Sequence, residues 1–143
     1  MLIASRFYPI VLTESSPDIA LIVDNEKVIR DLLEAFLETE GYETYTASSG
    51  IEGLRQVYEK RPDIVISDVV MAGMDGYEFC YLAREMCGVP IMMVTGVKAE
   101  SAVLRFNPEI DDYMLKPFEM DEFLKRVAGL ISRSRQHSVP VLS

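Results

Sequence analysis

Histidine and cysteine, on which zinc sites and many nucleophilic active sites depend, are scarce in this chain. Its 143 residues include one histidine, His137, and two cysteines, Cys80 and Cys87. A single histidine near the C-terminus excludes a histidine-based catalytic triad and a histidine zinc site. Seven residues along one predicted helix would separate the two cysteines by roughly 10 Å, too far for a disulfide. We therefore expect reduced thiols and a cytoplasmic protein.

The chain also lacks an excess of positive charge and any long apolar run. Its formal net charge of -9 argues against direct binding to a nucleic-acid backbone. Arg126, Arg133 and Arg135 form a small basic cluster, which we interpret as a solvated helix end. No apolar stretch approaches the length of a transmembrane helix, and residues 1–12 make a poor signal peptide. We expect neither nucleic-acid binding nor a membrane span.

Glycine-rich phosphate-binding motifs are missing as well. The sequence contains neither G-x-x-x-x-G-K nor G-x-G-x-x-G. Those motifs hold nucleotide phosphates on backbone N–H groups at the start of a helix. The sequence therefore gives no sign of either nucleotide-binding loop.

The chain does contain a regular alternation of short apolar runs and amphipathic segments. Central strands of a parallel sheet are continuously apolar, whereas helices repeat apolar residues every three or four positions. The alternation predicts an α/β fold in which helices cover both faces of a parallel sheet. The expected strands are residues 19–23, 43–47, 63–67, 91–94 and 113–115, and the expected helices are residues 26–40, 49–60, 77–86, 99–106 and 120–132. In helix 49–60 we expect Ile51, Leu54, Val57 and Tyr58 to face inward.

Chemically active side chains follow four of the five predicted strands. Asp24 and Asn25 follow the first, Asp68 the third, Thr95 the fourth and Lys116 the fifth. Because these strand ends share one edge of a parallel sheet, we expect the side chains to lie together. Carboxylates suit Mg²⁺ and can attack phosphorus, while a hydroxyl and an ammonium can hold phosphoryl oxygens. Singly, each residue is better explained as a helix cap, a strand residue or a surface charge; jointly they indicate a site.

These motifs resemble those of the receiver domain of two-component response regulators, and the chain is similar to the single-domain chemotaxis regulators. The combination is specific in this order, although no single motif is. The resemblance covers residues 18–133 and implies a flavodoxin-like, doubly wound five-stranded sheet with strand order 2-1-3-4-5. The matching segments are L-I-V-D-N-E at 21–26, I-V-I-S-D-V-V-M-A-G-M-D-G at 64–76, V-T-G at 94–96 and D-D-Y-M-L-K-P-F at 111–118.

The resemblance implies a signalling domain that assists only its own phosphorylation and dephosphorylation. Asp68 would accept a phosphoryl group from a sensor histidine kinase or a phosphotransfer protein. Thr95 and Lys116 would bind the phosphoryl oxygens, and Tyr113 would turn inward when Thr95 moves. The bond between Lys116 and Pro117 is the candidate for a cis peptide.

The resemblance also implies a magnesium site. Asp24, Asp68 and the backbone carbonyl of Val70 would hold Mg²⁺. Asn25 stands where the family usually has a second acid, so we expect weaker Mg²⁺ binding. Asn25 also leaves open a pseudo-receiver, in which the fold is a phosphorylation-independent interaction or dimerisation module. An aspartyl-phosphate hydrolase is a weaker alternative, since Val70 occupies the place of its second acid.

The remaining expectations concern partners and chain ends. Phosphorylation would change the surface formed by helix 99–106, strand 113–115 and helix 120–132. A downstream protein target would bind there, and the same face is a candidate for a homodimer. Residues 1–17 are expected to form an N-terminal extension and residues 134–143 a polar tail.

Overall fold

The computed structural model of the chain describes residues 16–71, 73–96 and 110–138. Our predictions for the first fifteen residues, for helix 99–106 and for residues 139–143 lie outside these segments. No helix in the described segments is long and apolar enough to cross a membrane.

Five parallel strands form one sheet in the order β3-β2-β4-β5-β6. Numbered along the chain, this is the predicted order 2-1-3-4-5. The flavodoxin-like, doubly wound arrangement is therefore confirmed. The strands are β2 (Ile19–Val23), β3 (Glu43–Ala47), β4 (Ile64–Ser67), β5 (Ile91–Thr95) and β6 (Asp112–Leu115).

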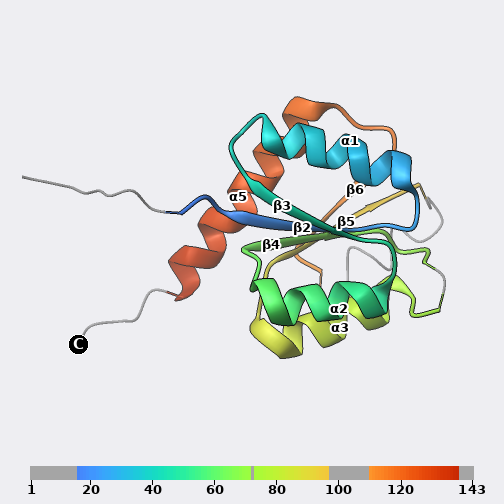
Figure 1. Ribbon diagram of the computed structural model, residues 1–143. Helices are drawn as coiled ribbons and strands as arrows, with labels where there is room; N and C mark the ends of the chain where they lie inside the picture. The colour runs from blue at the N-terminus through green and yellow to red at the C-terminus, as the bar shows by residue number, and fades with distance from the viewer. Residues whose placement is uncertain (1–15, 72, 97–109, 139–143) are drawn as a thin grey trace, which may run out of the picture.

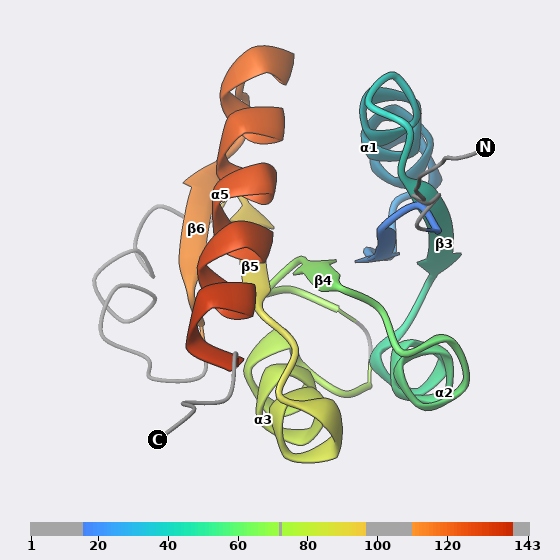
Figure 2. The ribbon, with the colours of Figure 1, turned by 90° about the vertical axis from the view of Figure 1, so that its left-hand side faces the viewer.

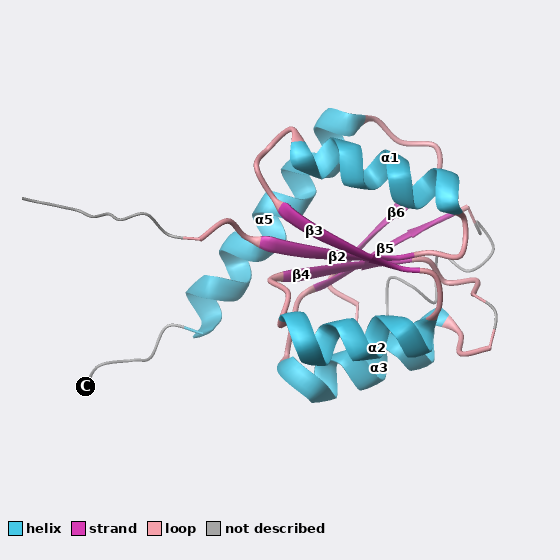
Figure 3. Ribbon diagram, viewed as in Figure 1, coloured by secondary structure: helices cyan, strands magenta, loops and turns pink. Residues whose placement is uncertain are grey.

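The described helices cover both faces of the sheet, as predicted. Figures 1 and 2 show α1 and α5 on one face and α2 and α3 on the other. The strand arrowheads in Figure 3 all point to the same edge, where the loops that follow the strands begin. The helices are α1 (Lys27–Glu38), α2 (Gly50–Lys60), α3 (Gly76–Cys87) and α5 (Met120–Ser138).

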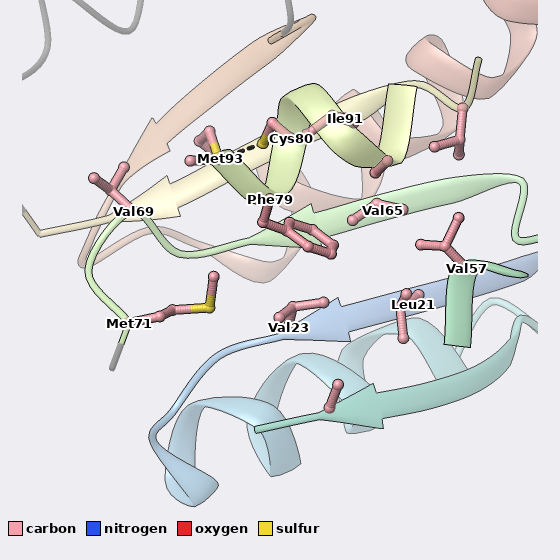
Figure 4. Packing of buried hydrophobic residues seen from close by; sticks show 13 residues of the cluster. Leu21, Val23, Val57, Val65, Val69, Met71, Phe79, Cys80, Ile91 and Met93 are labelled. Carbon is pink, nitrogen blue, oxygen red and sulfur yellow. Dashed lines mark hydrogen bonds between the residues drawn. The ribbon is translucent and has the colours of Figure 1, made fainter. Parts of the chain in front are cut away.

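Each face of the sheet has its own apolar core, because strand side chains alternate between the two faces. Figure 4 shows the core beneath α2 and α3, where Phe79 packs among the valines of the central strands. The thiol of Cys80 lies 3.6 Å from the Met93 sulfur in this core. Cys80 and Cys87 both lie on α3 and are not joined by a disulfide. The other core includes Ile22, Leu33, Leu37, Ile66, Met92, Val94, Phe123 and Val127.

Two apolar residues of α2 that helical spacing predicts to face inward are instead exposed. The side chains of Ile51 and Tyr58 are 61% and 63% exposed. The inner face of α2 is centred on Gly53 and Val57, both buried. At about 100° per residue, Ile51 and Tyr58 point away from that line. The prediction for these two residues was wrong.

The last helix is longer than predicted. We expected it to end at residue 132, whereas α5 continues to Ser138. Arg135 explains part of this extension, because its guanidinium pairs with Asp18 and lies 3.4 Å from Asp63 Oδ1. Arg126 is also paired, with Glu122 at 2.7 Å and Asp112 at 3.3 Å. These two arginines are thus salt-bridge partners rather than a freely solvated helix end.

Candidate functional site

Strand pairing places Asp24 and Asp68 next to each other. Val23 of β2 is paired with Ser67 of β4, and each aspartate follows directly. The Asp68 N–H donates to the Val23 carbonyl at 3.0 Å, which continues the ladder beyond the strand ends. Asp24 is only 2% exposed and Asp68 only 7%. Two carboxylates are therefore held side by side in a largely dry environment.

Lys116 reaches the same two carboxylates from β6. Its backbone N–H donates to the Thr95 carbonyl at 2.8 Å, which fixes the residue at the end of the sheet. Its Nζ lies 3.3 Å from Asp24 Oδ2 and 3.4 Å from Asp68 Oδ2. The predicted grouping of these three charged residues is therefore confirmed. The peptide bond between Lys116 and Pro117 is cis, as the family pattern indicated.

The loop after β4 fixes the orientation of the Asp68 carboxylate. Asp68 Oδ1 accepts hydrogen bonds from the N–H groups of Val69 at 2.7 Å and Val70 at 3.4 Å. The loop then closes where the Gly76 N–H donates to the Val69 carbonyl at 2.9 Å. A Cβ on Gly76 would lie 2.3 Å from the Asp68 carbonyl oxygen, so only glycine fits there. With Oδ1 bound to the backbone, Oδ2 is the oxygen that lies near Lys116.

The segment between β2 and α1 holds Asp24. Asp24 Oδ1 accepts from the Glu26 N–H at 2.8 Å, and the Asp24 carbonyl accepts from Arg30 at 2.7 Å. Burial raises the pKa of Asp24; the Glu26 N–H and the Lys116 ammonium oppose this, while the charge of Asp68 adds to it. Our sequence reasoning did not identify Arg30. The feature that could have identified Arg30 was its position on the first turns of α1, from which its side chain reaches back toward Asp24.

The donor atoms at this edge fit a hard divalent cation. Asp24 Oδ2 and Asp68 Oδ2 already converge on one positive charge, the Lys116 ammonium. Carboxylates are the ligands that Mg²⁺ prefers, and the ion commonly keeps several waters. Among the described residues, no three or more His, Cys, Asp or Glu side chains form a group that could hold a metal ion. A metal here would therefore depend on these two carboxylates, with other oxygens and water completing its shell.

Thr95 and Tyr113 lie on neighbouring strands near the same edge. The Thr95 side chain is fully buried at the end of β5, whereas Tyr113 is partly buried on β6. Tyr113 is paired with Met93, which precedes Thr95 by two residues. Alternation along the strands therefore puts the Thr95 and Tyr113 side chains on one face of the sheet. Tyr113 packs against the core beneath α2 and α3.

Glu26 brings a third carboxylate to the site, one that the sequence motifs did not identify as a site residue. Its Oε1 lies 3.8 Å from Lys116 Nζ, while its side chain is 62% exposed. Asn25, which stands where the family usually has a second acid, is exposed in the loop before α1. Glu26 lies inside the motif at 21–26, but nothing in the sequence tells which way its side chain points.

Comparison with known proteins gives a consistent result. A sequence model described as the response regulator receiver domain matches residues 20–128. A CheY-like receiver domain protein from Methanospirillum hungatei is 28% identical, with a TM-score of 0.80 over 86% of this chain and 100% of its own. A putative response regulator from Chloroflexus aurantiacus is 36% identical, with a TM-score of 0.74 over 81% and 98%. The response regulator TrrA from Thermotoga maritima, solved with Mg²⁺-BeF, is 33% identical, with a TM-score of 0.73 over 79% and 98%.

Proposed function

Because the chain belongs to the response regulator receiver domain family, a signalling family, we propose that Asp68 accepts a phosphoryl group in a Mg²⁺-dependent reaction. The donor is a sensor histidine kinase or a phosphotransfer protein in the cytoplasm. Asp68 is the best candidate acceptor because it is the carboxylate that follows the central strand β4 and has one oxygen bound by backbone N–H groups.

The observation that carries this proposal is the position of Lys116 Nζ, 3.3 Å from Asp24 and 3.4 Å from Asp68. An ammonium placed against a buried acceptor can stabilise the negative charge that a phosphoryl group brings. A fold that served only as a binding module would not need to keep this ammonium between two buried acids. The geometry thus favours a reactive site over the pseudo-receiver.

The proposed transfer exchanges one bond to phosphorus for another. An oxygen of the Asp68 carboxylate attacks phosphorus, the bond from phosphorus to the donor imidazole breaks, and the imidazole nitrogen keeps the electron pair. An acyl phosphate forms on Asp68, and the catalytic work is positioning and charge stabilisation. Lys116 and the Thr95 hydroxyl hold the phosphoryl oxygens.

The proposed magnesium ligands are Asp24, Asp68 and the backbone carbonyl of Val70, with Asn25 as a neutral oxygen donor. The bound ion would neutralise the charge of the phosphoryl oxygens. The structure of the Thermotoga maritima relative was solved with Mg²⁺-BeF, which supports the same dependence here.

The proposed output runs through Thr95 and Tyr113. A phosphoryl group that draws the Thr95 hydroxyl toward Asp68 opens space on the face that Tyr113 shares. The surface that includes β6 and α5 then changes and binds a downstream protein target or a second copy of the chain as a homodimer. In support, β5 and β6 are directly paired, with Thr95 beside Leu115, so the neighbouring strand is in position to respond to movement at Thr95.

Phosphorylation of the purified chain tests the proposal. We expect incubation with acetyl phosphate and Mg²⁺ to add the mass of one phosphoryl group, and beryllofluoride to compete with it. The Asp68→Asn variant should show no addition, because an amide oxygen is a far poorer nucleophile than a carboxylate. Intact mass spectrometry with mapping of the modified peptide measures both.

Asp31→Asn is the matched control, because Asp31 is an exposed carboxylate of α1 that pairs with Lys27 on the same helix. It should be modified as fully as the wild type. Failure of the wild type to be modified would favour the pseudo-receiver instead, and equal modification of Asp68→Asn would show that Asp68 is not the acceptor.

A further inference from the structure

The magnesium site proposed above has one negative charge fewer than its family usually provides. Asn25 offers an amide oxygen where a second acid is expected, so only Asp24 and Asp68 are charged among the proposed ligands. A divalent cation is bound more tightly as the number of nearby carboxylates increases. Another carboxylate close to Asp24 and Asp68 could supply the missing negative charge.

Besides Asp24 and Asp68, Glu26 is the described residue whose carboxylate pairs with Lys116. Its Oε1 lies 3.8 Å from Lys116 Nζ, the same nitrogen that lies 3.3 Å from Asp24 and 3.4 Å from Asp68. Its backbone is also fixed, since the Glu26 N–H donates to Asp24 Oδ1 at 2.8 Å. The Glu26 backbone is therefore held next to Asp24, a proposed metal ligand, and its carboxylate lies near the same ammonium as the two buried carboxylates.

We propose that Glu26 supplies the negative charge that Asn25 lacks, and that it strengthens Mg²⁺ binding from outside the ion's direct ligands. This inference rests on the proposed function of the site. Glu26 is not placed as a direct ligand, because its side chain is largely exposed and lies farther from Lys116 Nζ than the side chains of Asp24 and Asp68 do. Its carboxylate is 62% exposed and acts through water, by Coulomb attraction over a few ångströms.

An ordinary surface salt bridge is the alternative explanation, and the chain contains one for comparison. Lys27 and Asp31, four residues apart on α1, pair at 2.7 Å with side chains 77% and 58% exposed. Lys116, the partner of Glu26, is only 20% exposed and contacts two buried carboxylates. The charge of Glu26 thus acts on a poorly solvated position, where water screens it less, whereas the charge of Asp31 is surrounded by solvent.

Calorimetric titration of Mg²⁺ into the unphosphorylated chain tests the inference without any measurement of activity. We expect Glu26→Gln to raise the dissociation constant by roughly three- to tenfold at low ionic strength. Asp31→Asn, which removes the same charge from the same helix, should change it by less than about twofold. Asn25→Asp should tighten binding by roughly tenfold, and Glu26→Gln should cost less in that background because the missing charge is already present.

Ionic strength distinguishes a charge acting through water from a direct ligand. The effect of Glu26→Gln should shrink several-fold when the ionic strength rises from about 0.02 M to about 0.5 M, because an exposed charge is screened. An effect that persists at high salt would overturn the placement outside the direct ligands.

The failure of this inference is separable from that of the proposed function. If the wild type binds Mg²⁺ and Asp24→Asn weakens binding, but Glu26→Gln changes it no more than Asp31→Asn, the inference alone is wrong. If the wild type binds no Mg²⁺, or if Asp24→Asn leaves binding unchanged, both are wrong.

Discussion

Asp24 carries a conflict between stability and function that can be read from its surroundings. The side chain is 2% exposed and holds its charge close to a second carboxylate, Asp68. Burial raises the pKa of Asp24, and the Glu26 N–H and Lys116 only partly counteract it. A carboxyl whose pKa is higher in the folded than in the unfolded state destabilises the fold wherever it is ionised.

The Asp24→Asn variant should therefore be more stable than the wild type at pH 7, by about 1 kcal/mol in the free energy of unfolding. The amide keeps the shape and an oxygen for the Glu26 N–H. The gain should shrink as the pH falls through the raised pKa of Asp24 and disappear well below 3.8, the ordinary value, where the wild-type carboxyl is protonated in both states. Urea unfolding of both proteins across this pH range measures it.

Asp31→Asn serves again as the control, since an exposed carboxylate should change stability by less than about 0.5 kcal/mol. A lower stability of Asp24→Asn at pH 7 would show that its contacts with Lys116 and the Glu26 N–H outweigh its burial.

At the scale of elements, the junction between the loop after β4 and α3 leaves no room for a side chain at Gly76. A Cβ on Gly76 would lie 2.3 Å from the Asp68 carbonyl oxygen and 2.7 Å from Val69 Cα. Both neighbours are backbone atoms, which cannot move aside by changing rotamer. The start of α3 is thus packed directly onto the residue proposed to be phosphorylated.

Gly76→Ala should lower the free energy of unfolding by roughly 2–3 kcal/mol, because the loop has to shift to admit the methyl group. The control is Gly129→Ala in α5, where the nearest atom to a Cβ is the flexible end of Arg133 at 3.5 Å. That variant should instead gain about 0.5–1 kcal/mol from helix propensity. Chemical unfolding of the two variants measures both, and a loss that is equal in the two would contradict the packing argument.

The elements also show why part of the structure could be predicted from the sequence. Apolar runs such as Ile19–Val23 indicate central strands because the spacing of their apolar residues and their composition both favour a buried strand. The ends of these strands then bring Asp24, Asp68 and Lys116 together. The end of α5 was not predictable, because Arg135 pairs with Asp18, 117 residues away in the chain. The direction of the Glu26 side chain could not be predicted either, since it depends on the backbone turn after Asp24.

For the whole molecule, the strongest consequence of the charge distribution is a dependence of stability on Mg²⁺. The formal net charge is -9, and two of the carboxylates are buried next to each other. An ion that binds only the folded chain stabilises it by mass action. Here it would also relieve repulsion between Asp24 and Asp68.

At a free Mg²⁺ concentration ten times the dissociation constant, we expect a stabilisation of about 1.4 kcal/mol, or about 4 °C in melting temperature. Thermal unfolding in MgCl₂, compared with NaCl at equal ionic strength, measures it and removes the general effect of salt on a charged chain. Asp24→Asn should show little of the specific increase. An equal increase in NaCl would contradict a specific site.

The position of Lys116 gives this site an internal competitor. Because the ammonium lies within 3.4 Å of both buried carboxylates, they are not left to repel each other unaccompanied in the metal-free chain. A divalent cation entering between them meets a positive charge that is covalently tethered and never diffuses away. The affinity for the proposed metal ion would therefore depend on how much more strongly the two carboxylates attract the divalent cation than the Lys116 ammonium. Any substitution that changes how Lys116 is held would then also change that affinity.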